Sequence, residues 1–547
     1  MKHIYGAEAI VKSLEREGIE IVFGIPGLYD MPIFDALYRH PTIRTITVRH
    51  EQGAAFMADG YARVTGKPAA ILTLPGPGLT NALTGIGEAF SDSVPMLILS
   101  TQVNRDFIDQ DRGVLHEMTG QFDMLSNLTK YGERITAETD IRMVFQRAMQ
   151  ALKSGRPRPV QIEIPRDIQV AQVPWTEADE GTQPAHVNPI VPSEEQLLHA
   201  VSALQKAKFP LIYAGGGVIR SNASAELQQL AELLGAPVLT TGMGVGAIPG
   251  DHPLWCGVPW IAGGADVRPV VEACDAFLAV GTRFNQGMTA DWNLALPETS
   301  IRIDIDADEI ERNIPTRYKL IGDAKATLSK FITLLKEQNL DRQGQVLQPL
   351  TKAQATFKAG LQAKVGGTTP WMTALREALP RDTILSCDMT LFWADMLSIF
   401  PIYEPHTMLF PWGFGTLGFG LPEALGAKLA YPDRPVAAIV GDGAFLFTGG
   451  ELATAVQYDL NIPIIVPNND AYGMIKVQQR DQYDAQFMAV DLVNPDFIAL
   501  AEAFGAYGKK ATTPDTLKTI LSEALSANKP TVIEIRWGWT WGNENGG

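Results

Sequence analysis

Cysteine is scarce in this chain. Only three cysteines occur in 547 residues, at Cys256, Cys274 and Cys387, and no two of them form a CxxC pair. Secreted scaffolds that are stapled by disulfides carry cysteine at a much higher density. The scarcity therefore argues against a disulfide scaffold and predicts a protein of the reducing cytoplasm.

A positive charge excess and a long apolar run are also missing. Lys and Arg number 45 against 61 Asp and Glu, the net charge is −16, and the basic residues form no block. Nucleic-acid-binding proteins usually show the opposite balance. No apolar run approaches the roughly 20 residues that span a bilayer, and residues 1–20 read as an amphipathic helix rather than a signal peptide. We therefore expect no nucleic acid and no membrane as partners.

The sequence does contain enough apolar residues for several cores, since hydrophobic residues make up 46% of it. Apolar, strand-like runs alternate with helical periodicity in three successive segments, which predicts an α/β fold with three doubly wound parallel-sheet domains. Two segments of weak periodicity read as linkers, and the C-terminal tail shows no periodicity. The predicted domains are 1–175, 193–336 and 350–547, the linkers 175–193 and 337–349, and the tail 537–547.

The most informative stretch runs from Gly441 to Tyr472. A strand-like run at 436–440 leads into Gly-Asp-Gly, and a second such run at 462–466 leads into Asn468-Asn469. A helical pattern at 451–458 lies between them. In a parallel sheet the carboxyl ends of both strands lie at one edge, where ligands bind.

This edge suits a hard divalent cation. Asp442 offers a carboxylate and Asn469 an amide oxygen, while the N–H groups of Gly443 and Ala444 can meet phosphate oxygens. One carboxylate is too little charge for a tight cage made of protein alone, so the pattern favours Mg²⁺ shared with a diphosphate. The alternative is an ordinary glycine turn followed by a capping asparagine.

Glu51 is the second candidate acid. It follows His50 where a strand pattern gives way to a helical one. A glutamate in the first turn of a helix is also favoured by the helix dipole, so a purely structural role is the alternative.

Several motifs resemble one enzyme family. Asp442 and Asn469 are separated by 469 − 442 = 27 positions, and this GDG…NN pattern is similar to the thiamine diphosphate (ThDP) signature. The surrounding segments resemble the acetolactate-synthase-like branch of ThDP enzymes over nearly the whole chain. They are GIPG at 24–27, RHEQGAAFMADGYAR at 49–63, GPGLTNALTGIGEAFSDSVPML at 76–97, SGRPRPVQIEIPRDIQ at 154–169, GGGVI at 215–219, IRIDIDADEI at 301–310 and GFGTLGFGLPEALGAKLA at 413–430.

The resemblance implies a pyrimidine-binding, a middle (transhydrogenase-like) and a diphosphate-binding domain. ThDP would bind between two subunits, so a homodimer is the minimum and a homotetramer is usual. Glu51 would protonate the aminopyrimidine ring, Leu417 would be the wedge that bends the cofactor, and Gly415 and Leu417 would contact the ring through their main chains. Mg²⁺ would be held by Asp442, Asn469 and the backbone oxygen of Ala471. Further cofactor contacts would come from Gly443, Ala444, Tyr472, Gly473 and Met474.

The reaction that the resemblance implies starts from a 2-oxo acid. The ylide of the cofactor attacks the acid, CO₂ leaves and an enamine remains, for which the cofactor is the electron sink. Protonation of the enamine releases an aldehyde, which makes the protein a carbon–carbon lyase. Attack on a second 2-oxo acid would make it an acetolactate-synthase-type carboligase. A non-catalytic relative is the third alternative, and intact Glu51, Asp442 and Asn469 argue against it.

Departures from the synthases favour the decarboxylase. Val477-Gln478 stands where they usually carry Gln-Trp, Leu417 replaces their usual Met, and Leu115-His116-Glu117 replaces their Phe-Gln-Glu. The combination of RHEQGA, GPGLTNA, DSVPML and LHE most resembles sequences labelled 5-guanidino-2-oxopentanoate decarboxylase, with acetolactate synthase close behind. His116 becomes a candidate proton donor or carboxylate partner, and the expected substrate pocket is shaped by Gln121, Ile475 and Gln478.

The middle domain departs from the family in one motif. Residues 281–286, GTRFNQ, differ from the GxRFDDR run that is associated with FAD. The sequence therefore leaves FAD open as a second cofactor and disfavours it.

Overall fold

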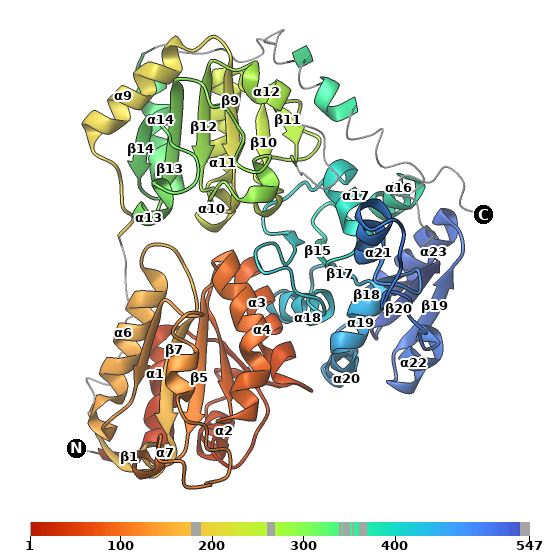
Figure 1. Ribbon diagram of the computed structural model, residues 1–547. Helices are drawn as coiled ribbons and strands as arrows, with labels where there is room; N and C mark the ends of the chain where they lie inside the picture. The colour runs from red at the N-terminus through yellow and green to blue at the C-terminus, as the bar shows by residue number, and fades with distance from the viewer. Residues whose placement is uncertain are drawn as a thin grey trace.

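The computed structural model describes residues 2–176, 188–259, 268–338, 342, 351–352, 355–359 and 369–536. The tail at 537–547 and most of the two predicted linkers lie outside these residues. Figure 1 shows three α/β units, the first in red and orange, the second in yellow and green, and the third in cyan and blue.

The first unit is built on a six-stranded parallel sheet. Its strands lie in the order β3 (Arg44–Thr47), β2 (Ile21–Gly24), β4 (Ala69–Thr73), β5 (Met96–Gln102), β7 (Val160–Pro165) and β6 (Tyr131–Arg134). Its helices are α1 (Gly6–Glu17), α2 (Met31–Arg39), α3 (Glu51–Thr65), α4 (Pro77–Asp92), α5 (Gln121–Met124), α6 (Ile141–Lys153) and α7 (Arg166–Val170). A short antiparallel pair completes the unit, β1 (Lys2–Tyr5) with β8 (Gln172–Trp175).

The middle unit repeats this architecture. Its six parallel strands lie in the order β11 (Trp255–Gly257), β10 (Val238–Thr240), β9 (Pro210–Ala214), β12 (Ala276–Val280), β13 (Thr299–Asp304) and β14 (Tyr318–Ile321). Its helices are α9 (Glu194–Lys206), α10 (Gly216–Arg220), α11 (Ser224–Leu234), α12 (Arg268–Glu272), α13 (Ala307–Ile310) and α14 (Ala324–Glu337).

The third unit has the same six-stranded parallel arrangement. The strand order is β16 (Met408–Leu409), β15 (Ile384–Cys387), β17 (Val436–Ile439), β18 (Pro463–Asn468), β20 (Thr531–Arg536) and β19 (Tyr507–Ala511). Its helices are α16 (Thr369–Ala378), α17 (Leu391–Ile399), α18 (Gly420–Ala430), α19 (Asp442–Thr448), α20 (Leu452–Gln457), α21 (Gly473–Gln482), α22 (Phe497–Ala503) and α23 (Pro514–Leu525). The α/β fold with three doubly wound parallel sheets is confirmed.

Each sheet carries helices on both faces, so its central strands are apolar throughout. In β4 every residue is buried, and successive residues alternate between two cores. Ala69 and Ile71 pack into the core beneath α3 and α4, while Ala70 and Leu72 pack into the core beneath α1 and α6. This explains why the strand reads as an unbroken apolar run.

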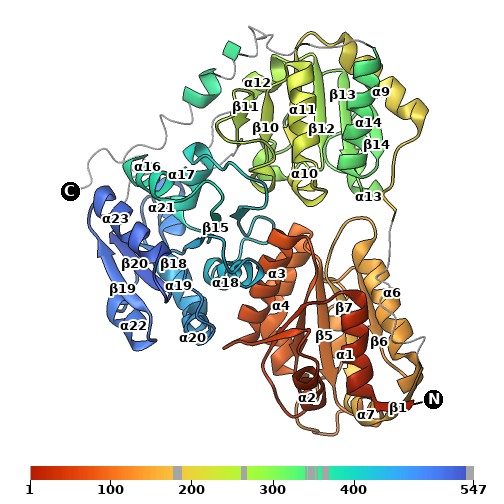
Figure 2. The ribbon, with the colours of Figure 1, turned by 180° about the vertical axis from the view of Figure 1, so that it is seen from behind.

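Helices α3 and α18 join the first and third units. They lie side by side in both views (Figures 1 and 2). Gly60 of α3 faces the main chain of Glu423, and Gly426 of α18 faces the main chain of Met57. A Cβ atom at either glycine would collide with the opposite backbone, so glycine sets the close approach of these two helices.

The strand–turn–helix at 436–458 differs from the sequence prediction in one respect. Helix α19 begins at Asp442 itself, and α20 follows after a short 3₁₀ turn, whereas the periodicity predicts a helix only from 451. Pro467 lies inside β18, opposite Ile535 of β20. Pairing with β17 stops at Ile465, so the donor that proline lacks is not needed on that side. Within the described part of the chain, no helix combines the length and apolar character needed to cross a membrane.

Candidate active site

The carboxyl edge of the third sheet gathers polar side chains around Asp442. Its side chain is almost fully buried, at 3% exposed. Asn494 Nδ2 lies 2.8 Å from Asp442 Oδ2 and 3.1 Å from Asn468 Oδ1. Burial raises the pKa of Asp442, and hydrogen bonds from Asn494 and from the N–H groups of Gly443 and Ala471 oppose this rise.

The segment after β18 brings Asn494 to this cluster. The chain turns back on itself, with the N–H of Tyr472 donating to the Val490 carbonyl and that of Leu492 to the Asp470 carbonyl. Asn494 follows directly and also donates to Asp470 Oδ1. Sequence reasoning missed Asn494, since it lies 52 residues after Asp442 in a stretch without periodicity.

These groups fit a magnesium ion. The side-chain Oδ1 of Asn469 accepts the N–H of Ala471 at 3.2 Å, and Asn494 Oδ1 is buried with no hydrogen-bond partner among the described residues. In the same part of the chain no group of three or more His, Cys, Asp or Glu side chains gathers as a metal cage. A cation would therefore rest on Asp442, on amide and backbone oxygens, and on oxygens from its ligand, which are the hard donors Mg²⁺ prefers.

The loop before α18 carries Gly415 and Leu417. Gly415 has φ +73° and Gly418 φ +81°, the left-handed region that favours glycine. Leu417 is half-buried against the apolar core that α3 and α18 share. A Cβ atom at Gly415 would stand 3.3 Å from Met389 Cε, a tight contact that adds to the need for glycine at this positive φ.

Helix α21 displays the predicted pocket residues of this domain. Ile475 and Gln478 are exposed and lie three residues apart, hence on one face of the helix. Met474 is half-buried against the core behind the helix. Tyr472 packs against Gly443, where an added Cβ would stand 2.7 Å from Tyr472 Cε1.

The carboxyl edge of the first sheet holds Glu51. It is the first residue of α3, 8% exposed, and the preceding His50 caps the helix by accepting the Gln52 N–H. Asn81 Nδ2 of α4 donates to Glu51 Oε2 at 3.0 Å. Asn81 was not predicted as a site residue from the sequence, although it lies within the GPGLTNAL motif.

A second buried acid lies beside Glu51. Asp30 is fully buried, and its Oδ1 accepts the Gly27 N–H at 2.7 Å. Burial raises the pKa of Asp30 to about 7, the Gly27 N–H opposes this, and the charge of Glu51 adds to the rise. Asp30 was also missed, because an acid just before a helix reads as an ordinary cap.

His116 and Gln121 reach the same edge by different routes. His116 has φ +64°, and its ring meets Tyr29 edge-on with centroids 5.8 Å apart. Gln121 is fully buried, where its Oε1 accepts the Gly76 N–H and its Nε2 donates to Thr101 and Glu163. Gln121 therefore touches the edge by holding the loop at Gly76, with no side-chain atom exposed in this chain.

The candidate residues thus form two half-sites on different domains. Glu51, His116 and Gln121 lie on the first sheet, and the remaining cofactor, metal and pocket candidates lie on the third. Glu451 ties the two domains together within one chain, since its carboxylate accepts the N–H groups of Arg49 and His50 at 3.0 Å.

A separate cavity lies between the first and middle units. It measures about 360 Å³ and is lined by residues of both, including Arg156, Arg220, Arg283, Asp304 and Asp323. Gly217 and Gly281 turn at the ends of β9 and β12, so close that a Cβ at Gly217 would stand 2.6 Å from Gly281 Cα. Such glycine turns at the carboxyl ends of parallel strands are typical of nucleotide sites.

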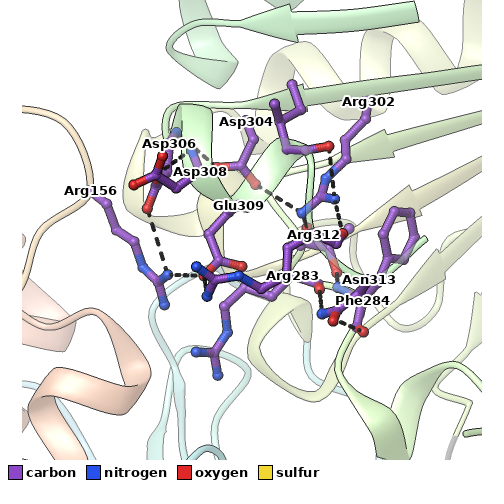
Figure 3. A network of polar contacts seen from close by, with 12 residues as sticks. Arg156, Arg283, Phe284, Arg302, Asp304, Asp306, Asp308, Glu309, Arg312 and Asn313 are labelled. Carbon is purple, nitrogen blue, oxygen red and sulfur yellow. Dashed lines mark hydrogen bonds and ion pairs between the residues drawn. The ribbon is translucent and has the colours of Figure 1, made fainter. Parts of the chain in front are cut away.

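Charged side chains of the first and middle units form a network beside this cavity (Figure 3). Arg156 of the first unit pairs with Glu309 of the middle unit at 3.0 Å, and Glu309 also pairs with Arg312 at 2.7 Å. Burial lowers the pKa of Arg156 to about 10, and the charge of Arg283 lowers it further. Arginines and carboxylates are the groups that bind the diphosphate and ribose of a nucleotide, so the cavity does not exclude FAD, which the GTRFNQ segment disfavours.

Three parallel-sheet domains, two of which carry complementary half-sites at their carboxyl edges, define a cofactor-dependent α/β enzyme. The chain belongs to the thiamine pyrophosphate enzymes. It matches the N-terminal TPP binding domain of that family at residues 4–124, the central domain at 197–331 and the C-terminal TPP binding domain at 389–535. Thiamine pyrophosphate is the same compound as ThDP.

Curated relatives divide between two activities. The chain is 36% identical to a probable acetolactate synthase large subunit of Methanocaldococcus jannaschii, with 97% of this chain and 91% of that protein covered. It is 35% identical to the acetolactate synthase large subunit of Haemophilus influenzae, with 98% and 95% covered. It is also 36% identical to a probable 2-ketoarginine decarboxylase of Pseudomonas aeruginosa, with 98% and 94% covered.

Proposed function

We propose that this enzyme is a ThDP- and Mg²⁺-dependent decarboxylase that converts a 2-oxo acid to an aldehyde and CO₂. The observation that carries the proposal is the exposed face of α21, where Ile475 and Gln478 stand and the synthase-like tryptophan is missing. In the synthases, that tryptophan helps select the second 2-oxo acid. Its absence here favours release of the aldehyde over coupling to a second 2-oxo acid. Because the Pseudomonas relative is named a probable 2-ketoarginine decarboxylase, 2-ketoarginine (5-guanidino-2-oxopentanoate) is a candidate substrate.

The roles of the chain's own residues follow from the two half-sites. When bound, ThDP supplies the electron sink for loss of CO₂. Glu51 holds the proton that the aminopyrimidine ring needs, and Asn81 fixes the carboxyl group through Oε2. Asp442, Asn469 and the backbone oxygen of Ala471 hold Mg²⁺, while the N–H groups of Gly443 and Ala444 receive the diphosphate.

The remaining candidates position these groups or shape the pocket. Leu417 serves as the wedge under the cofactor, and Gly415 contributes its main chain. His116, edge-on to Tyr29, is the proposed proton donor or carboxylate partner for the substrate. Gln121 acts through the Gly76 loop, and Ile475 and Gln478 contact the substrate.

We propose a homo-oligomer, with a dimer as the minimum and a tetramer as the working form. Glu51 of one subunit would then face Asp442 of its partner. Large apolar side chains are exposed beside the third-domain half-site, with Phe414 at 55%, Leu446 at 49% and Phe447 at 52%. Exposed apolar surface of this kind is typical of interfaces.

Product analysis tests the reaction type. With ThDP and Mg²⁺ present, we expect pyruvate, longer 2-oxo acids and 2-ketoarginine to give aldehyde and CO₂ without coupled product. The panel also ranks the substrates. Acetolactate or another 2-hydroxy-3-oxo acid as the main product would instead establish the carboligase, the activity named for the Methanocaldococcus and Haemophilus relatives. We also propose that FAD is not required: activity is expected without added FAD, and activity that appears only when FAD is added would contradict this.

Asn494→Ala tests the residue that the structure adds to the metal cluster. Asn494 orients Asp442 from 2.8 Å, and loss of a group that orients a metal ligand typically costs about 10–100-fold in metal affinity. We expect that loss in a Mg²⁺ titration of ThDP binding. Asn461→Ala is the matched control, since Asn461 bonds to the Leu525 carbonyl at the opposite end of β18. Equal Mg²⁺ affinity in the two variants would show that Asn494 does not support the metal site.

A further inference from the structure

The second half of α4 holds the loop that carries Gly415 and Leu417. Glu88 Oε2 accepts the N–H of Thr416 at 3.3 Å and its hydroxyl at 3.0 Å, and Glu88 Oε1 lies 3.4 Å from the N–H of Phe414. One turn later, Asp92 Oδ2 accepts the N–H of Trp412 at 3.0 Å. A helix of the first domain thus fixes alternate backbone N–H groups of a third-domain loop.

Packing reinforces the same contact. Gly87 faces the Phe414 ring, where an added Cβ would stand 3.0 Å from two ring carbons. Gly413 leaves no room for a Cβ either, which would stand 2.7 Å from Asp92 Oδ1. The main chain of the loop packs against α4, so the conformation of the loop depends on the hydrogen-bond acceptors that the α4 side chains provide.

We propose that Glu88 is a positioning residue, whose buried carboxyl group fixes residues 413–418 so that the main chain of Gly415 and Leu417 is ready to receive the aminopyrimidine ring. This inference rests on the proposed function, because it assigns the loop to ThDP. Glu88 itself touches no reacting atom. It acts through Phe414 and Thr416, the immediate neighbours of Gly415.

The charges around Glu88 explain why its protonation state matters. Its carboxyl group is fully buried, and the acids near it are Asp92 on α4, Asp59 on α3 and Glu423 on α18. Arg63 of α3 pairs with all three. Arg220 of α10 donates to the Asp92 carbonyl in the same cluster.

These surroundings favour the neutral acid while the loop is docked. Burial raises the pKa of Glu88 to about 8, Asp92 adds to the rise, and Arg63 opposes it. A neutral carboxyl group accepts the two N–H groups without adding a further buried negative charge. A released Glu88 would titrate near its ordinary range, so docking is fully favoured below that range and weakens as the pH rises through about 8.

Calorimetric titration of ThDP with Mg²⁺ into the full-length protein tests the proposal. Glu88→Ala removes the acceptor for both N–H groups, and we expect ThDP affinity to fall about 10-fold or more, as for loss of hydrogen bonds to buried donors. Glu88→Gln keeps one acceptor oxygen and stays neutral at every pH, so near pH 6.5 it should bind ThDP more tightly than Glu88→Ala does. Thr84→Ala, on the exposed face of α4, is the control and should bind as wild type does.

The pH profile separates positioning from simple support of the fold. We expect wild-type affinity for ThDP to fall relative to that of Glu88→Gln between pH 6.5 and 9, since only wild type ionises there. Thr416→Val should lose affinity at every pH, because it removes the hydroxyl contact alone. Glu88→Ala that binds like wild type, or a Glu88→Gln profile parallel to wild type, would overturn the proposal.

Failure of the proposed function gives a different pattern. A wild-type protein that binds no ThDP would overturn the assignment of the loop, and the role of Glu88 with it. A wild type that binds ThDP but decarboxylates no 2-oxo acid would overturn only the reaction. If Glu88→Ala does not fold, the comparison of Glu88→Gln with wild type across pH decides alone.

Discussion

Glu51→Gln is expected to reduce turnover of a 2-oxo acid by about 10²–10⁴-fold, the range for loss of a proton-transferring side chain. Glutamine has the same shape, and its amide oxygen can still accept the Asn81 N–H that now bonds to Oε2. It cannot release or take up the proton that the aminopyrimidine ring needs. Folding and ThDP affinity should therefore stay close to wild type while the reaction stops.

The measurement is the turnover rate with saturating ThDP and Mg²⁺, beside the ThDP affinity of the same preparation. Asp35→Asn is the matched control, an acid-to-amide change on the exposed side of α2, and it should leave both quantities unchanged. Glu51→Asp, with the carboxyl group drawn back, should keep a small part of the activity. Full turnover in Glu51→Gln would exclude Glu51 from proton transfer.

The parts of the fold that could be predicted are those buried on both faces. Strands β4 and β17 are buried at every position, so they appear as continuous apolar runs in the sequence. The strands that escaped prediction lie at sheet edges. Strand β6 is half-exposed at most positions and β19 is mostly exposed, so neither carries an apolar run. Helix α19 was missed because its glycine-rich surroundings read as a turn.

The site residues also divide into those that local sequence motifs reveal and those that only the fold brings together. Glu51 and Asp442 could be found from sequence because each begins a helix directly after a strand, within a motif of fixed spacing. Asn494 and Glu88 act through contacts that no local spacing encodes. Glu88 meets Thr416 across 328 positions of sequence, so only the packing of α4 against the third domain brings them together.

Asp442→Asn is expected to weaken Mg²⁺-dependent ThDP binding more than about 100-fold, since loss of an orienting residue alone costs about 10–100-fold. Asp442 is the acid at the centre of the cluster, and its carboxylate supplies the charge that the amide and backbone oxygens lack. Asparagine keeps the shape and can still accept the Asn494 N–H at Oδ1. The loss would therefore report on charge and not on a collapsed site.

Asp470→Asn is the control that makes this result specific. Asp470 lies in the same loop and also accepts from Asn494, but it is paired with Arg536 at 2.8 Å. We expect its replacement to change Mg²⁺ affinity little, because the Arg536 charge already offsets it. If Asp470→Asn abolished binding and Asp442→Asn did not, the cation would belong to Asp470. Both variants replace an acid by an amide beside Asn494, so the difference in their Mg²⁺ affinities shows which carboxylate binds the cation.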